Sequence, residues 1–385
     1  MQLLRRGDSG PAVVEIRAKL REYGLLAPPG PAPSENYFDD DVEHAVQAFQ
    51  QRRGLITDGI VGHATYRALR EASWKLGDRM LALLVSSPMS GDDVAQLQER
   101  LLELGYDPGR PGGVFDDMTE NALRGFQRDY GLTPDGVCGP ATLRSLRQLG
   151  RKVTGGRPGL LREQELLRRA GPRLRGKRIV VDPGHGGQDR GVQVSGVDEA
   201  DLVWDLGRRL VGRMAATGME ALLSRREDTC PTDAERATFA NAAGADLVLS
   251  LHTDANHSMH AQGLATFHFG NGSGATSTVG EALAGLIQRE LLTRTAMLDC
   301  GSQARTWELL RLTRMPTVRV EIGYLTSMGD RQKLLDPAFR DIVAEGILVA
   351  VKRLYLLGQD DQPTGTFTFS DVLARELGRG QAQAI

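Results

Sequence analysis

Two histidines and two glutamates occupy positions in the sequence where a catalytic centre could form. His185 lies in a DPGHGG segment at the end of the apolar run 178–182, and the glycines of this segment let the backbone turn sharply. His252 and Glu321 each lie near the end of another apolar run, and Glu199 comes just before a predicted helix. Because strand ends gather at one edge of an open α/β sheet, we expect these four side chains to converge there.

The types of these residues point to metal-assisted hydrolysis. Two imidazoles and one carboxylate, with a fourth position left open, are common ligands of a catalytic zinc ion. We therefore predict that His185, Glu199 and His252 bind Zn²⁺. Such a metal lowers the pKa of a water molecule to roughly 7. A carboxylate outside the metal shell must then move a proton from the water to the leaving amine, and Glu321 is our candidate for this catalytic role.

The elements that position these residues follow from the apolar pattern. Apolar runs alternate with helical patterns, which predicts an α/β domain with a mixed, mostly parallel sheet flanked by helices. The predicted strands are 178–182, 221–224, 246–251 and 317–322. The predicted helices are 201–214, 232–243 and 337–356. His268 alternates with two phenylalanines on a further strand, where we expect a structural role.

The first 150 residues contain one pattern twice. Phe49-Gln50, Asp58-Gly59 and Thr65 recur at the same spacing as Phe126-Gln127, Asp135-Gly136 and Thr142. Each copy starts with apolar residues at helical spacing, continues with a helix that ends in Phe-Gln, and closes with a helix that the threonine opens. This predicts two small all-α modules of three helices each, in front of the α/β domain.

The segments around the four candidate residues resemble the zinc-dependent N-acetylmuramoyl-L-alanine amidases of the amidase 3 family. The matching stretches are VDPGHGGQD at His185, GVDEADL at Glu199, SLHTDA at His252 and MPTVRVEIGYL at Glu321. Members of this family cleave the amide between the lactyl group of N-acetylmuramic acid and L-alanine of the stem peptide. The resemblance thus implies three zinc ligands and an acid/base glutamate at these positions.

A few residues depart from that pattern or lie close to it. Ser327 stands where the family usually has Asn, and Arg190 where Pro is common, which concerns substrate positioning and leaves the metal ligands intact. His257 and His260 follow the second histidine segment and either line the cleft or lie on the surface. His44 and His63, in the repeats, are expected to be solvated or capping residues.

The repeat resembles the peptidoglycan-binding domain 1 family, whose mark is an FQ-x-x-x-G-L-x-x-D-G-x-x-G run. It implies peptidoglycan, muramyl peptides or their precursors as partners, unless the modules keep the fold without the binding. We therefore divide the chain into binding modules at 1–74 and 88–150, a linker at 151–176, a zinc amidase domain at 177–357 and a regulatory tail at 358–385.

Charge and the N-terminal segment bear on location. Lys+Arg 47 against Asp+Glu 49 gives a net charge of −2, which argues against nucleic acid as the main partner. The N-terminal segment lacks an apolar signal region, and no run approaches the roughly 20 apolar residues of a membrane span. Three dispersed cysteines fit a reducing compartment. We expect a cytoplasmic protein without a membrane span.

A cytoplasmic amidase would be separated from the cell wall, which motivates an alternative function. Two binding modules before an unexported amidase domain resemble the architecture of an actinobacterial member of the family. This resemblance implies a regulator of peptidoglycan precursor synthesis that hydrolyses little or nothing, acts through a partner enzyme and is controlled by a Ser/Thr kinase. Thr364, Thr366 and Thr368 alternate with phenylalanines in the tail and are the candidate phosphorylation sites, unless the tail is a frayed end.

Overall fold

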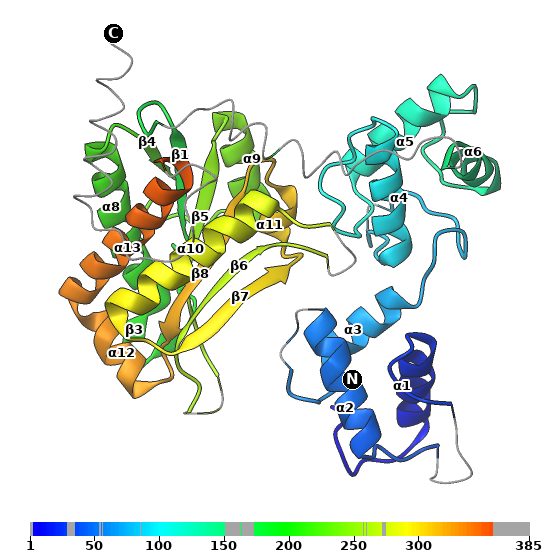
Figure 1. Ribbon diagram of the computed structural model, residues 1–385, viewed down its shortest axis with the longest axis horizontal. Coiled ribbons are helices and arrows are strands. Elements are labelled where there is room, and N and C mark those ends of the chain that lie inside the picture. Colours follow the sequence, from blue (N-terminus) through cyan, green and yellow to red (C-terminus); the bar gives the residue numbers. More distant parts are fainter. Residues whose placement is uncertain are drawn as a thin grey trace. The chain divides into compact units, whose positions relative to one another are not determined.

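Alternating strands and helices build the C-terminal half of the chain around one six-stranded sheet (Figure 1). The computed structural model describes residues 3–28, 35–53, 55, 57–84, 86–150, 163, 173–256, 258, 260–271 and 275–356. The helical modules and the sheet domain form separate compact units. The predicted fold class, an α/β domain preceded by all-α modules, is confirmed.

The sheet is mixed and mostly parallel, as predicted. Its strand order is β4-β1-β5-β8-β6-β7. The strands are β1 (Arg178–Pro183), β4 (Glu220–Leu223), β5 (Leu247–Asp254), β6 (Leu264–Phe269), β7 (Asp299–Arg305) and β8 (Thr317–Tyr324). The first four strands in this order run parallel, and β6 joins β8 antiparallel. The carboxyl ends of β1, β5 and β8 therefore meet at one edge, while a short hairpin of β2 (Gln193–Val194) and β3 (Val197–Asp198) leads into the next helix.

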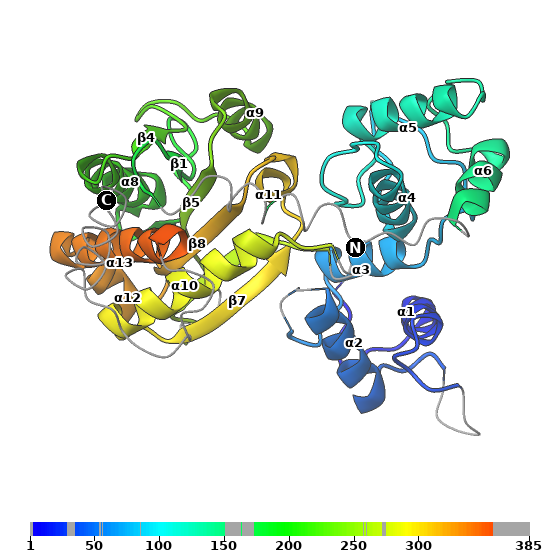
Figure 2. The same cartoon turned by 45° about the horizontal axis from the view of Figure 1, so that its top comes forward.

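Helices cover the two faces of the sheet unequally (Figure 2). Three long helices, α8 (Glu199–Ala216), α10 (Thr278–Thr295) and α13 (Pro337–Leu356), bury one face in a continuous apolar core. The opposite face has a small apolar cluster where α9 (Asp233–Ala243) packs over β1 and β5. Two short helices, α11 (Glu308–Leu312) and α12 (Met328–Leu335), flank β8. By alternation, Asp182, Ser250 and His252 share the face of Val180 and Val248, so these polar side chains lie on the face with less helical cover.

The helices of each module pack around their own apolar core. The first module contains α1 (Pro11–Glu22), α2 (Asp40–Arg52) and α3 (His63–Ala72), and the second contains α4 (Asp92–Glu103), α5 (Asp117–Asp129) and α6 (Pro140–Gly150). Phe49 and Phe126, from the repeated Phe-Gln pair, are fully buried in the two cores. The third helices begin at His63 and Pro140, two residues before the threonines expected to open them.

The threonines instead belong to a buried polar network that is the same in both copies. The Gln50 amide nitrogen donates to the Asp58 carboxylate (2.8 Å), the Ile60 carbonyl (3.0 Å) and the Thr65 hydroxyl (3.1 Å), while the amide oxygen accepts from the Gly59 backbone N–H (2.9 Å). In the second copy the network has the same distances around one glutamine, and its members are Gln127, Asp135, Gly136, Val137 and Thr142. The repeated residues therefore hold the turn between the second and third helices.

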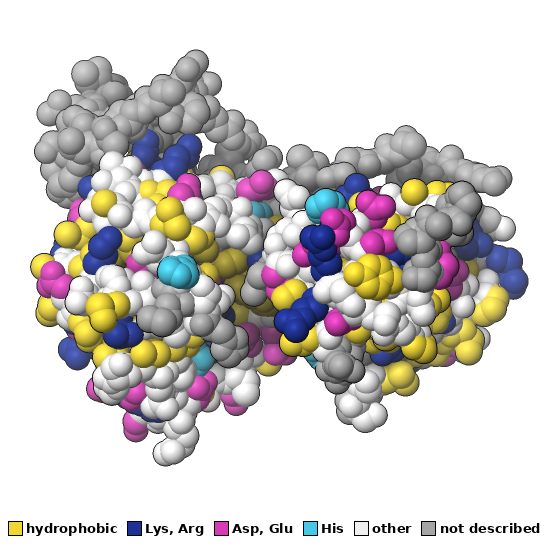
Figure 3. Space-filling model, turned by 90° about the horizontal axis from the view of Figure 1, so that it is seen from below, with side chains coloured by type: hydrophobic (Ala, Val, Ile, Leu, Met, Phe, Trp, Pro, Cys, Tyr) yellow, Lys and Arg dark blue, Asp and Glu magenta, His cyan; other side chains and the backbone are white. Residues whose placement is uncertain are grey.

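The surface is of mixed charge. On the face seen in Figure 3, acidic and basic side chains are interspersed among apolar and neutral ones. This agrees with the near balance of the sequence, whose net charge is −2. Within the described part of the chain, none of the helices combines the length and the apolar character that crossing a bilayer requires.

Candidate active site

His185 lies on a loop that two buried arginines hold in place. Its own backbone is left-handed, with φ of 56°, because the loop turns back at the end of β1. Arg236 donates to the carbonyls of Pro183 (3.0 Å) and His185 (2.8 Å), and Arg225 donates to those of Pro183 (2.8 Å) and Gly184 (3.1 Å). Buried carbonyls need such donors, so the arginines fix the position of the imidazole.

Asp182, at the end of β1, fixes the start of the same loop. Its buried carboxylate accepts hydrogen bonds from Arg236 (2.6 Å), Ser250 (2.7 Å) and Ser224. Burial opposes ionisation, but the charge of Arg236 and the two hydroxyls hold the pKa of Asp182 below its usual range. The carboxylate is therefore ionised and ties β1, β5 and α9 together beneath the site.

Glu199 joins the two histidines. It is the first residue of α8 and is buried, with Oε2 lying 3.2 Å from His185 Nε2 and Oε1 lying 3.1 Å from His252 Nδ1. The backbone N–H groups of Val192 and Thr253 also donate to its carboxylate. Burial would raise the pKa of Glu199, yet the hydrogen bonds with both histidines keep it far below its usual range.

These three side chains fit a metal ion. One ligand atom from each of His185, Glu199 and His252 lies within 4.8 Å of the others. Ligand atoms on a tetrahedral metal with bonds of about 2.0–2.1 Å are about 3.3–3.4 Å apart. Each imidazole lies at a similar distance from a different oxygen of the Glu199 carboxylate, His185 3.2 Å from Oε2 and His252 3.1 Å from Oε1. Asp189 Oδ2 lies 2.8 Å from His185 Nδ1 and orients this ring, as carboxylates commonly do for histidine ligands.

Two glycines let the chain approach the ligands closely. A Cβ at Gly184 would lie 2.0 Å from the His252 ring. A Cβ at Gly191, where φ is +66°, would lie 2.7 Å from both the Glu199 carboxylate and the His185 ring. Atoms cannot approach that closely, so these positions require glycine for the three ligands to meet.

Glu321 lies beside the ligands on the next strand. His252 on β5 and Glu321 on β8 are register partners, and β6 places Ala265 on the other side of Glu321. Burial raises the pKa of Glu321 to about 7, although the Arg319 guanidinium, 3.1 Å from Oε1, acts in the opposite direction. A carboxyl group with this pKa can both accept and release a proton near neutral pH.

The structure brings together all four residues that the sequence singled out, and it separates the weaker candidates from them. His44, His63 and His260 are exposed, and His268 is buried on β6. His257 and the tail residues Thr364, Thr366 and Thr368 lie outside the described residues.

The two residues that depart from the family pattern have structural partners. Ser327 caps α12 through the Asp330 backbone N–H. Arg190 forms ion pairs with Asp198 (2.8 Å) and Asp201. Both therefore stabilise segments that flank the site.

Sequence reasoning missed several residues of the site. Asp189 stands four residues after His185 within the same signature, a spacing that could have indicated a supporting carboxylate. Arg225 and Arg236 carry no local signal of their role, because their contacts with the loop carbonyls are long-range. Arg319 precedes Glu321 by two residues, and alternation along a strand places both on one face.

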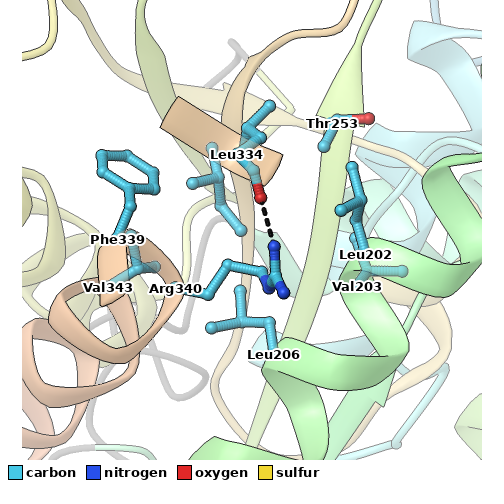
Figure 4. Close-up of a pocket in the computed structure, with 9 residues that line it drawn as sticks. Leu202, Val203, Leu206, Thr253, Leu334, Phe339, Arg340 and Val343 are labelled. Carbon is cyan, nitrogen blue, oxygen red and sulfur yellow. Dashed lines mark hydrogen bonds between the residues drawn. The ribbon is translucent and has the colours of Figure 1, made fainter. Parts of the chain in front are cut away.

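A small apolar pocket lies between the sheet and the helices of this domain (Figure 4). Its lining comes from α8, β5, β8, α12 and α13, and comprises Leu202, Val203, Leu206, Thr253, Ile322, Leu334, Phe339, Arg340 and Val343. Thr253 follows His252 on β5, so its side chain points to the opposite face of the sheet. The pocket therefore belongs to the helix-covered core and contributes no acid/base group to the four-residue site.

The fold and this site define the class of the protein: the chain belongs to the N-acetylmuramoyl-L-alanine amidase family. Residues 179–353 match this family, and residues 9–69 and 90–146 match the peptidoglycan binding domain. The chain is 54% identical over 384 residues to the N-acetylmuramoyl-L-alanine amidase CwlM of Mycobacterium tuberculosis, covering 97% of this chain and 95% of that protein. The expected resemblance to an actinobacterial member with the same architecture is confirmed.

Other relatives match the sheet domain. The N-acetylmuramoyl-L-alanine amidase LytC of Bacillus subtilis is 33% identical over 172 residues, covering 45% of this chain and 34% of that protein. Among solved structures, the N-acetylmuramoyl-L-alanine amidase from Clostridium difficile 630 is 30% identical with a TM-score of 0.45, covering 48% of this chain and 99% of that chain.

Proposed function

We propose that this protein is a zinc-dependent amidase that cleaves the bond between N-acetylmuramic acid and L-alanine in peptidoglycan or its fragments. The observation that carries the proposal is the meeting of His185, Glu199 and His252, with Glu321 beside them in register. The three ligands would hold a zinc ion, which when bound supplies Lewis-acid activation of water and of the scissile carbonyl.

The residues of the chain supply the rest of the chemistry. Glu321, with its pKa near 7, would take a proton from the attacking water and deliver it to the amide nitrogen that leaves. Burial lowers the pKa of His252, which keeps this imidazole neutral and able to bind metal. Asp189 would hold His185 in the required orientation.

Zinc content tests the metal site without relying on activity. Purified protein should contain about one zinc per chain, and His185→Ala and His252→Ala should each lose most of it. His260→Ala is the matched control, because this histidine is exposed and lies outside the cluster. Undiminished zinc in a His185→Ala, His252→Ala double variant would overturn the assignment. Release of the stem dipeptide from N-acetylmuramoyl-L-alanyl-D-isoglutamine tests turnover.

The same proposal divides the chain at the predicted boundaries 1–74, 88–150, 151–176, 177–357 and 358–385. The two modules would hold peptidoglycan or muramyl precursors for the amidase domain. Co-sedimentation of the full chain with purified sacculi tests this role. The polar networks around Gln50 and Gln127 are internal to the modules, so binding should involve other residues on their surfaces.

A second proposal concerns regulation, and it rests on the sequence after the amidase domain. A cytoplasmic chain with a Thr/Phe-rich tail would act on a partner enzyme of precursor synthesis after a Ser/Thr kinase modifies Thr364, Thr366 or Thr368. Deletion of residues 359–385 should then abolish capture of the partner and leave zinc content unchanged. Capture of the same partners by the truncated chain would exclude the tail as the contact.

A further inference from the structure

Beyond the four-residue site, the same face of the sheet carries a group of cationic and aromatic side chains. On β8, Arg319 lies two residues before Glu321 and therefore shares its face. On β6, Phe267 is the register partner of Arg319, and on β7 Arg305 is the register partner of Phe269. Three adjacent strands thus extend the face of Glu321 toward the edge of the sheet.

The side chains in this group stack on one another. The Arg319 guanidinium lies 4.6 Å from the centroid of the Trp307 ring, and the Arg305 guanidinium lies 5.8 Å from the same centroid. Arg305 also lies 5.2 Å from the Phe267 ring, whose centroid is 4.7 Å from that of Trp307. Trp307 is 36% exposed, so solvent reaches this stack.

The stack holds more positive charge than its neighbours neutralise. Arg319 forms an ion pair with Glu321, 3.1 Å away. The guanidinium of Arg305 donates to the Ala304 carbonyl (2.9 Å) and the Gln303 side chain (2.5 Å), and within the described residues no carboxylate forms an ion pair with it. Burial lowers the pKa of Arg305 to about 10, which leaves it charged at neutral pH. A half-buried cation without a counter-ion is costly, and an anionic ligand would relieve that cost.

We propose that Arg305 and Arg319, which stack on the Trp307 ring, form a subsite for an anionic group of the substrate beside the scissile amide. Guanidinium groups match the planar carboxylate and the phosphate through paired hydrogen bonds. The anion is therefore a carboxylate of the stem peptide or a phosphate of a nucleotide- or lipid-linked muramyl precursor. This subsite rests on the proposed amidase function, because the substrate must place its amide at Glu321.

Substitution of Arg305 tests the subsite, since this residue is neither a proposed metal ligand nor the proposed acid/base residue Glu321. Arg305→Met keeps the apolar stem against Phe267 and removes the charge. The zinc-loaded full chain is assayed on N-acetylmuramoyl peptides whose isoglutamate is either a free acid or an amide. If the anion is the isoglutamate carboxylate, Arg305→Met should lower kcat/KM about tenfold to a hundredfold for the acid and leave the amide substrate within about twofold. Arg314→Met, at an exposed arginine, is the charge-matched control and should change neither.

A binding measurement separates this proposal from the proposed function. Calorimetry on the zinc-loaded Glu321→Gln variant uses the same two peptides and the uridine-diphosphate-linked muramyl peptide with an amidated stem. If adding Arg305→Met to this variant weakens the binding of the acid peptide alone, the anion is a carboxylate. If it weakens the binding of the uridine-diphosphate-linked peptide alone, the anion is a phosphate. If parent protein cleaves nothing, the amidase proposal fails while this assay still decides the subsite. Equal affinity with and without Arg305→Met for all three ligands would overturn the subsite.

Discussion

Gln50 and Gln127 in the helical modules are surrounded by partners from their own module, whereas His185, Glu199 and His252 in the sheet domain turn their ligand atoms toward one another. Each glutamine bonds an aspartate, a threonine, a carbonyl and a glycine N–H, with matching distances in the two copies. The ligand atoms of the sheet domain instead converge within 4.8 Å.

This difference shows that two equally clear sequence signatures can have different roles, one in holding the fold and one in placing residues for chemistry. In the modules, the glutamine, the aspartate and the glycine N–H satisfy one another and build the turn, so their recurrence reflects the fold. In the amidase domain, Asp182, Arg225 and Arg236 support the loop of His185, and the residues they position are available for chemistry. Substitutions in the two regions test this contrast.

Replacing the proposed acid/base residue should give the largest effect. Glu321→Gln keeps the size of the side chain and removes its ability to accept a proton, so kcat on a muramyl peptide should fall about 10²–10⁴-fold. Zinc content should stay at the parent value because Glu321 is outside the ligand cluster. Glu308→Gln, at an exposed glutamate of α11, is the control. Parent-like turnover in Glu321→Gln would move the acid/base role to another residue.

Loss of the hydrogen bonds around Gln50 should lower the stability of the first module and leave turnover unchanged. Gln50→Ala removes the partner of four groups and should destabilise the first module by about 2–4 kcal/mol. Gln51→Ala, at the exposed neighbour on the same helix, should change stability by less than about 0.5 kcal/mol. Amide hydrogen exchange of α2 in the full chain measures both. If Gln50→Ala lost sacculus binding with unchanged exchange, the network would be a ligand site and the contrast would break down.

The close approach at Gly184 provides a test of how tightly the ligands are held. Gly184→Ala would place a methyl group 2.0 Å from the His252 ring, so zinc affinity should fall about tenfold to a hundredfold as the ring moves. Gly212→Ala, in α8 with open space around its Cβ, should retain affinity and gain about 0.5–1 kcal/mol of stability. Competition with a chelating zinc indicator gives both affinities. Equal affinities would mean that the loop relaxes freely around His252.

A pH-dependent effect concerns the stability of metal-free protein. Because the folded pKa of Glu321 is raised to about 7, its protonated form stabilises the folded state at low pH, and this contribution disappears as pH rises through 7. Glu321→Gln should therefore be more stable than the parent by about 2–3 kcal/mol at pH 8 and nearly equal to it at pH 4. Denaturant unfolding of the sheet domain in the presence of chelator measures the difference. A constant difference across this range would mean that the ionisation of Glu321 is not linked to folding.

Local patterns in the sequence were enough to predict the elements and the four central residues. The strands at 178–182, 246–251 and 317–322 were predicted because buried parallel strands are short apolar runs, and each element is present at that place. The sequence patterns did not predict the helix α10 or the strand β7. β7 is an edge strand of mostly polar, half-buried residues, so it has no apolar alternation to reveal it.

By itself, the sequence determined which residues stand at strand ends and helix starts, because periodicity and turn chemistry are local properties of the chain. The tertiary structure decided which of these ends meet. It placed Glu321 opposite His252, Asp189 against His185, and Arg305 with Arg319 on Trp307. Strand order and register depend on how distant segments pack their apolar faces, and that choice is made by the whole core at once, so no local pattern contains it.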